Sequence, residues 1–112
     1  MPDAANKATM RSDLAGDPEM ADLIGLFLQE LPKRVDSLTQ AWRARELETV
    51  QRLAHQLKGS SAGYGFPAIG AAAARVEDCI RAKDPSVQLD QLAHQVQELI
   101  SLCRRASPKK AA

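Results

Sequence analysis

The segment PEMADLIGLFLQELPKRVDSLTQAW, residues 18–42, decides the fold class of this chain. Its apolar residues recur every three or four positions, which is the spacing of one face of an α-helix. Asp17 suits the N-cap of that helix and Pro18 its first turn. Pro32 interrupts the segment, but the apolar spacing resumes in phase, so we expect a kink rather than a helix end. The predicted buried face consists of Leu23, Ile24, Phe27, Leu31, Val35, Leu38 and Trp42.

Three further stretches of the chain show the same helical spacing. The first of them ends at Gly63-Tyr64-Gly65, where a glycine can take the left-handed conformation that terminates a helix. Phe66-Pro67 opens the next stretch, and Lys83-Asp84-Pro85 breaks it. The apolar positions are Leu47, Val50, Ala54, Leu57 and Ser61; then Ile69, Ala72, Ala73, Val76 and Ile80; and finally Leu89, Leu92, Val96, Leu99, Ile100 and Cys103.

Four amphipathic helices with short connections predict an all-α fold, an antiparallel up-down-up-down four-helix bundle. The pattern also allows one short extra N-terminal helix around residues 11–15, before Gly16. A chain of 112 residues corresponds to a single domain. We assign the bundle to residues 13–105 and expect flexible tails at 1–12 and 106–112, which are polar or small and show no periodicity.

The composition argues against several classes of partner. The chain has 15 basic and 14 acidic residues, and its net charge of +1 gives no electrostatic basis for binding nucleic acid or an anionic membrane. The N-terminus lacks the apolar region of a signal peptide, and no stretch suits a membrane span. We therefore expect a cytoplasmic protein, and we also expect it to be a monomer. Cys79 and Cys103 fall on apolar stripes, so we expect buried free thiols.

The segment LAHQLKGSSAG, residues 53–63, gathers residues that favour a chemical role. Ala54 belongs to the buried stripe, so His55, rotated by about 100° around the helix, lies at the edge of that stripe and is reachable from solvent. Lys58 projects from the same side of the helix as His55, and Gly59 lies one helical turn beyond His55. A glycine inside a helix costs about 1 kcal/mol relative to alanine, which indicates a packing or functional reason for it.

These residue types suit a phosphoryl acceptor that another protein must reach. An uncharged imidazole is a competent nucleophile near neutral pH. Phosphorylation adds nearly two negative charges, which the ammonium of Lys58 would stabilise. Simpler interpretations stay open at this point. His55 could be an ordinary surface histidine, Lys58 could complement the helix dipole, and the small residues 59–63 could serve close helix packing.

The same window, with the bundle around it, resembles the histidine-containing phosphotransfer (HPt) domain family. The family pattern, an apolar residue followed by A-H-x-L-K-G-S-S and a glycine-containing turn, stands here as LAHQLKGSSAGYG, residues 53–65. The preceding helix, with a proline after an acidic residue, and the segment AAAARVED, residues 71–78, are also similar to the family. The resemblance extends from Asp17 to Cys103. One departure is the connection Arg43-Ala44-Arg45-Glu46, which lacks a frequent Gly-Asp turn and leaves the end of the first long helix open.

The resemblance implies a role for each residue of the site. His55 would be phosphorylated on Nε2, Lys58 would attend the phosphoryl group, and Gly59 would make room for a partner's active site. Glu77 would orient the imidazole, and Arg81 would add a second positive charge. We expect the partner to dock on the surface around His55, joined by apolar residues near the start of the first long helix. The docking residues are Gln51, Arg52, Gln56, Gly59, Ala62 and Arg81, with Met20 and Ile24 on the other helix.

The register of two helices predicts a contact between Glu77 and His55. Helices 47–62 and 67–82 are joined by a tight turn and should pack antiparallel. Counted from that turn at about 1.5 Å per residue, the two side chains lie within about 3 Å of the same height. We expect Glu77 to accept a hydrogen bond from Nδ1–H of His55, which fixes the tautomer and leaves Nε2 facing solvent. The alternative is a solvated Glu77 paired with Arg81 one turn along.

The sequence as a whole predicts a phosphocarrier of a two-component phosphorelay and not a self-sufficient enzyme. It contains no glycine-rich nucleotide loop and no strand-borne aspartate cluster for Mg²⁺. We therefore expect no cofactor or metal in this chain, with Mg²⁺ supplied by a partner. The expected partners are response-regulator receiver domains and hybrid sensor histidine kinases. Two alternatives are a helical adaptor or dimerisation bundle that never carries phosphate, and a metal or redox site of Cys79, Cys103 and His94.

Overall fold

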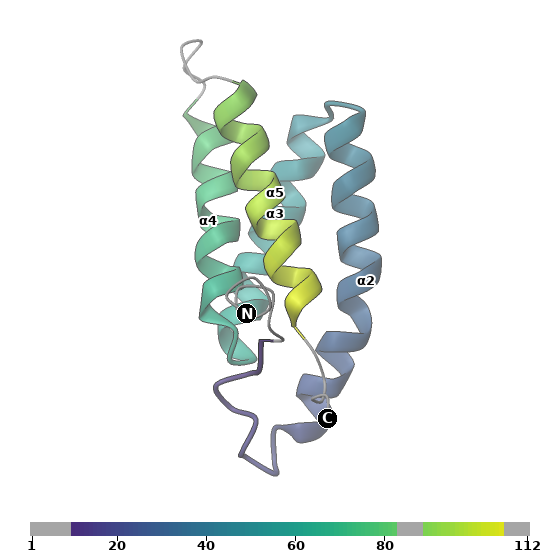
Figure 1. Ribbon diagram of the computed structural model, residues 1–112, viewed down its shortest axis with the longest axis vertical. Helices are drawn as coiled ribbons and strands as arrows, with labels where there is room; N and C mark the ends of the chain where they lie inside the picture. Colours follow the sequence, from purple (N-terminus) through teal and green to yellow (C-terminus); the bar gives the residue numbers. More distant parts are fainter. Residues whose placement is uncertain (1–9, 83–88, 107–112) are drawn as a thin grey trace, which may run out of the picture.

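The computed structural model describes residues 10–82 and 89–106 of the chain. These residues form the four helices α2 (Ala21–Arg43), α3 (Leu47–Gly63), α4 (Pro67–Arg81) and α5 (Leu89–Arg105). Consecutive helices run in opposite directions around a common core (Figure 1). The predicted all-α four-helix bundle is confirmed. Most of both expected tails, residues 1–9 and 107–112, lies outside the described residues.

The segment before α2 forms turns where the sequence allowed a short extra helix. Within the described residues, no helix precedes α2, which begins at Ala21 and not at Pro18. The predicted N-cap Asp17 does not cap α2, whose N-cap is Met20; its Oδ1 instead accepts the backbone N–H of Glu19 at 2.9 Å in the turn before the helix. Ser12 is buried and donates to the carbonyl of Tyr64 at 2.5 Å. This hydrogen bond ties the segment to the end of α3 and sets its path.

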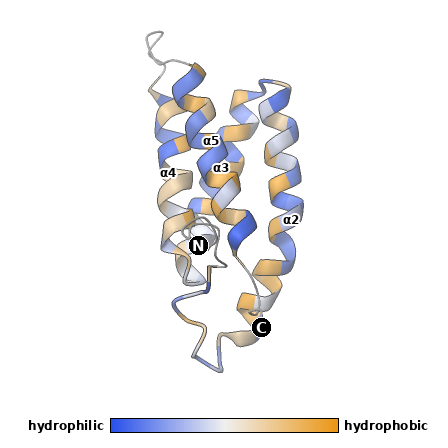
Figure 2. Cartoon of the chain, viewed as in Figure 1, coloured by the Kyte–Doolittle hydropathy of each residue, from blue (hydrophilic) through white to orange (hydrophobic). Residues whose placement is uncertain are grey.

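The predicted apolar stripes meet in one core. Each helix carries hydrophobic and hydrophilic residues along its length (Figure 2), and within the described residues none is long and apolar enough to cross a membrane. Two leucines assigned to the buried stripes are exposed instead, Leu23 at 45% and Leu89 at 57%. Both lie in the first turn of a helix, where fewer neighbouring side chains surround them. The described residues with no exposed surface are Leu38, Val50, Ala54, Ser61, Ile69, Ala72, Ala73, Val76, Val96 and Leu99.

The turn between α3 and α4 is a Schellman motif. The N–H of Phe66 donates to the carbonyl of Ser61 at 2.8 Å, and the N–H of Gly65 donates to that of Ala62 at 3.1 Å. Gly65 has a φ of 86°, in the left-handed region that the sequence assigned to a glycine of this turn. The carbonyl of Gly65 also accepts the N–H of Asp13 at 2.7 Å. The turn therefore closes the hairpin and anchors the N-terminal segment.

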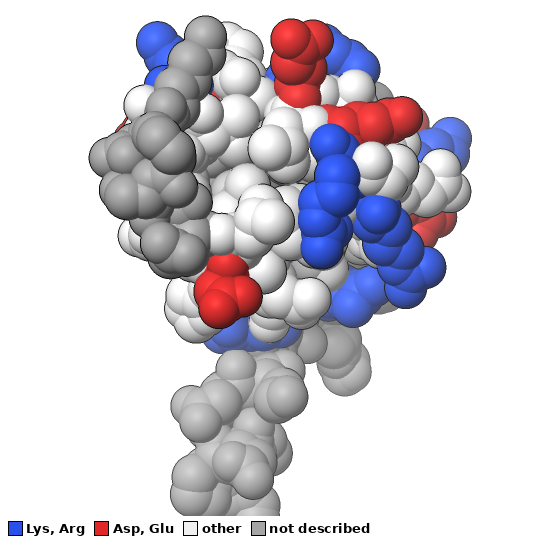
Figure 3. Space-filling model, turned by 90° about the horizontal axis from the view of Figure 1, so that it is seen from above, with Lys and Arg blue, Asp and Glu red and all other residues white. Residues whose placement is uncertain are grey.

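The turn between α2 and α3 has the same geometry without a glycine. The N–H of Glu46 donates to the carbonyl of Ala41 at 2.9 Å, and Arg45 takes the left-handed position with a φ of 58°. The guanidinium of Arg45 lies 4.1 Å from the ring centroid of Trp42, a cation–π contact that offsets the backbone strain. α2 thus ends at Arg43. Seen from this end of the bundle, Lys and Arg side chains gather on the side of α2 and α3 (Figure 3).

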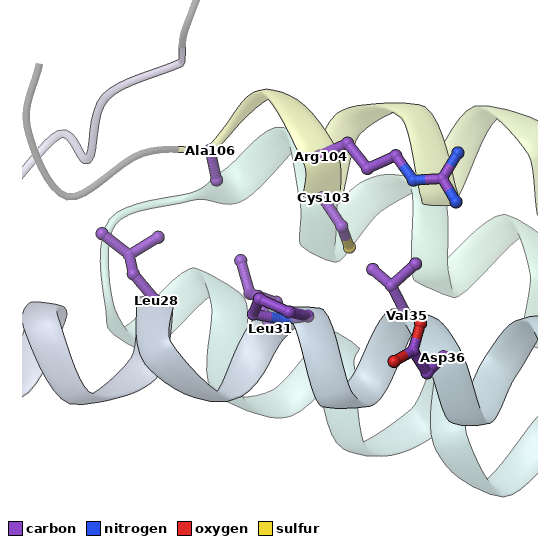
Figure 4. Close-up of a pocket in the computed structure, with 8 residues that line it drawn as sticks. Leu28, Leu31, Val35, Asp36, Cys103, Arg104 and Ala106 are labelled. Atoms are coloured by element: carbon purple, nitrogen blue, oxygen red, sulfur yellow. The ribbon is translucent and has the colours of Figure 1, made fainter. Parts of the chain in front are cut away.

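A crevice of about 210 Å³ separates α2 from the C-terminal end of α5. α2 continues through Pro32, which lies on one wall of the crevice, and Cys103 faces it from α5 (Figure 4). Burial raises the pKa of the Cys103 thiol to about 12, so it stays protonated at neutral pH. Cys79 was expected to be buried as well, but it is only half-buried, because it lies at the edge of the groove between α4 and α5.

We predict that Gly65→Ala destabilises the bundle by at least about 1–2 kcal/mol, since an alanine is strained in the left-handed region. An added Cβ would also collide with the hydroxyl of Ser12 and lie 2.9 Å from the backbone nitrogens of Asp13 and Leu14. Urea denaturation measures the effect. The matched control is Gly63→Ala, whose Cβ would meet nothing within 4 Å. Equal unfolding midpoints for the two variants would refute this assignment of the turn.

Candidate functional site

The site is built around a buried carboxylate. Glu77 follows the fully buried Val76 on α4, and its side chain is only 5% exposed. A charged carboxylate is costly to bury unless it is paired and hydrogen-bonded. Three basic side chains meet this requirement: His55 and Lys58 from α3, and Arg81 from α4 itself.

The imidazole of His55 is held at one ring nitrogen and open at the other. Its Nδ1 lies 3.0 Å from Oε2 of Glu77. An ionised carboxylate can only accept a hydrogen bond, so Nδ1 carries a hydrogen, and in the neutral form of the ring the lone pair is on Nε2. The side chain of His55 is 65% exposed, and Nε2 has no hydrogen-bond partner among the described residues. The predicted contact between Glu77 and His55 is present, and Glu77 is not solvated.

Two cations share the same carboxylate. The ammonium of Lys58 lies 3.0 Å from Oε1 of Glu77, and Nη1 of Arg81 lies 3.6 Å from Oε2. Mainly because of Lys58, and to a smaller extent His55, the pKa of Glu77 lies below its ordinary value even though burial acts to raise it. The charged carboxylate therefore stabilises the fold above its unfolded pKa, and this stabilisation is lost as the pH falls through its folded pKa.

Close packing of α3 on α4 brings these residues together. A Cβ placed on Gly70 would lie 3.5 Å from the carbonyl of Lys58 and 3.8 Å from the Cβ of Ala62. The small residue lets the two helices approach, and the tight turn at Gly65 fixes their relative height. The side chains of His55, Lys58, Glu77 and Arg81 consequently form one cluster. The helical register had predicted the contact between His55 and Glu77.

The surface beside His55 is open. Gly59 is exposed, and a Cβ placed on it would meet nothing within 4 Å. Of the predicted docking residues on α3, Arg52, Gln56 and Ala62 are exposed, whereas Gln51 is half-buried. Their roles in binding stay predictions.

The apolar part of the docking surface differs from the expectation. Ile24 is 7% exposed and belongs to the core, and Met20 is half-buried. Leu26, which was not among the predicted docking residues, is 59% exposed instead. It borders a groove of about 200 Å³ between α2 and the end of α3, which also includes Ser60 and Tyr64. The signal in the sequence that could have identified Leu26 is that it is an apolar residue outside the apolar stripe of its helix.

The cysteines and the second histidine do not form a site together. Cys103 faces the crevice between α2 and α5, Cys79 borders a groove between α4 and α5, and His94 is exposed on α5. Within residues 10–82 and 89–106, no group of three or more His, Cys, Asp or Glu side chains could hold a metal ion.

We predict that Glu77→Ala increases the fraction of His55 in the other neutral tautomer, because the acceptor that holds the hydrogen on Nδ1 is removed. Nitrogen chemical shifts of the ring report the tautomer ratio. His94 is an internal control, since its tautomer ratio should not change. An unchanged ratio at His55 would show that Glu77 does not orient the ring.

Comparison with known proteins gives one result that covers most of the chain. The family model described as Hpt domain matches residues 22–111. No curated protein and no solved structure gives a significant match. Hpt domains are phosphocarriers of phosphorelays rather than enzymes, and they interact with receiver domains or kinases. With its four-helix bundle and a match over most of its length, this chain belongs to the Hpt domain family.

Proposed function

We propose that this chain carries a phosphoryl group on Nε2 of His55 and exchanges it with aspartates of response-regulator receiver domains. The supporting observation is the asymmetry of the ring. Nδ1 is bound by a buried carboxylate 3.0 Å away, while the side chain is 65% exposed and Nε2 has no partner among the described residues. An oriented and accessible nucleophile is what a phosphoryl acceptor needs.

The transfer step follows from this tautomer. The lone pair of Nε2 attacks the phosphorus of an aspartyl phosphate, an N–P bond forms, and the P–O bond to the aspartate breaks. The aspartate leaves as a carboxylate. Because Nδ1 already carries its hydrogen, no proton has to move, and the phosphorylated ring becomes positively charged. Glu77 is in place to pair with that charge. In the reverse direction a receiver aspartate attacks, and Nε2 is the leaving group.

Charge neutralisation is shared between this chain and its partner. In-line phosphoryl transfer depends on positioning and on neutralising the phosphoryl oxygens. The ammonium of Lys58 is on the helix of His55, one turn along, and its side chain is 40% exposed. We propose that it contributes one positive charge, and that the receiver supplies Mg²⁺ together with the aspartate. The chain itself is a carrier with no cofactor of its own.

The docking surface proposed for the receiver is centred on α3. It combines the exposed residues around His55, Gly59 among them, with the groove beside Leu26. An exposed leucine beside a groove can bury apolar surface against a partner. Receiver domains and hybrid histidine kinases are the proposed partners, the cytoplasm is the proposed compartment, and a monomer is the proposed state.

We predict that His55 alone accepts label from a phosphorylated receiver domain in the presence of Mg²⁺. The product should be acid-labile and alkali-stable, as expected for a nitrogen–phosphorus bond. His55→Gln should fold normally and take no label. His94→Gln, a change of an exposed histidine on α5, is the matched control and should be labelled like the unmodified protein. Label that persists in His55→Gln would refute the assignment, and an unlabelled but folded parent protein would favour the adaptor function.

We predict opposite effects for two substitutions of Gly59. Gly59→Ala should transfer normally and stabilise the bundle by up to about 1 kcal/mol, because alanine favours the helix and the added Cβ meets no atom. Gly59→Gln should keep the fold and slow transfer, because its long side chain would extend over the surface beside His55. Transfer rates and unfolding midpoints of both variants are the measurements. A wild-type transfer rate for Gly59→Gln would show that the glycine does not serve partner approach.

A further inference from the structure

The two oxygens of Glu77 have unequal sets of partners. Oε2 lies 3.0 Å from Nδ1 of His55 and 3.6 Å from Nη1 of Arg81. Oε1 is buried and has no partner in good hydrogen-bond geometry, so the ion pair with the ammonium of Lys58 at 3.0 Å is its one close polar contact among the described residues. The buried carboxylate thus depends on Lys58 at one of its oxygens.

Phosphorylation of His55 would place a second anion, the phosphoryl group, within reach of the Lys58 ammonium that already pairs with Glu77. A phosphoryl group on Nε2 carries close to two negative charges and presents three acceptor oxygens. Lys58 is a single charge on the same face of the same helix, and it cannot neutralise both anions fully. If it turns to the phosphoryl group, Oε1 of Glu77 is left buried and unpaired, which is strongly unfavourable.

Arg81 has the geometry to take over the carboxylate. Its Nη1 is 3.6 Å from Oε2, too far for a good hydrogen bond, and its side chain is 61% exposed and therefore has room to move. It follows Glu77 by one helical turn, the favourable order for an acid and a base. The guanidinium is a planar fork that can bind both oxygens of one carboxylate.

We propose that Arg81 is a positioning residue that takes over Glu77 when His55 is phosphorylated and so releases Lys58 to the phosphoryl group. This inference rests on the proposed function of His55. In it Arg81 acts on the carboxylate and not on the phosphoryl group. Arg75 is the matched control, because it is an exposed arginine on the same helix whose Nε donates to Oε1 of Gln95, away from the cluster.

The first experiment tests the takeover without any phosphorylation. Carboxyl carbon NMR follows the titration of Glu77 in Lys58→Ala, Arg81→Ala and the double variant. If Arg81 can replace Lys58, the pKa of Glu77 stays below its ordinary value in Lys58→Ala and rises clearly only in the double variant. Lys58→Ala/Arg81→Lys should restore part of the lowering, because a charge is present but the fork is absent. A pKa that rises as far in Lys58→Ala as in the double variant overturns the inference.

The second experiment measures where Lys58 is in the phosphorylated protein. Phosphoramidate phosphorylates the chain directly, because its P–N bond breaks and releases ammonia as the Nε2–P bond forms. Phosphorus NMR then gives the pKa of the phosphoryl group, which a nearby ammonium lowers. Arg81→Ala should raise this pKa by roughly 0.2–0.7 units, the range for an ion pair near the surface. Arg75→Ala should leave it unchanged.

A double-mutant cycle with Lys58 decides between two roles for Arg81. If Arg81 acts through Glu77, Lys58→Ala and Lys58→Ala/Arg81→Ala give the same phosphoryl pKa. If Arg81 contacts the phosphoryl group itself, the double variant titrates higher than Lys58→Ala, and the inference is overturned. No effect of Arg81→Ala in either background overturns it as well. If the parent protein takes no phosphoryl group from phosphoramidate or from receivers, the proposed function is refuted. The Glu77 titration needs no phosphorylation, so it still tests the exchange of Lys58 for Arg81 in that case.

Discussion

The buried charge of Glu77 is the constraint on which the rest of the site depends. A carboxylate that is 5% exposed must be surrounded by donors, and these come from two helices at once. The rotation and height of α3 and α4 bring His55 and Lys58 to the two oxygens. Buried ion pairs often add little net stability, but they make alternative arrangements costly. Here that cost orients one imidazole and leaves its outer nitrogen open.

The hairpin of α3 and α4 supplies the precision that the carboxylate needs. A turn with one left-handed glycine, Gly65, sets the height of the two helices, and the small residue Gly70 allows their backbones to approach. Ser12 and Asp13 bond to the same turn, so the N-terminal segment reinforces it. α2 and α5 complete the core around this hairpin. They pack less closely on each other and leave a crevice of about 210 Å³ between them.

Much of the fold and part of the site follow from local rules. Helical spacing predicted the four helices, because the apolar residues of each repeat every three or four positions. It also placed His55 at the edge of a buried stripe and Lys58 on the same side. The contact of Glu77 with His55 was predictable because only one tight turn separates the two helices, so that counting residues gives their relative height.

The sequence by itself thus determined the bundle, the glycine turn between α3 and α4, and the approach of Glu77 to His55. Only the tertiary structure decided where the ends of long side chains lie: Lys58 and Arg81 both reach Glu77, and Arg45 lies over Trp42 in a turn without glycine. It also decided that Leu23 and Leu89 are exposed, although helical spacing placed both on buried stripes. The physical reason is that periodicity gives a residue's angle around its own helix, whereas burial and ion pairing depend on how far the neighbouring helices extend and what they carry.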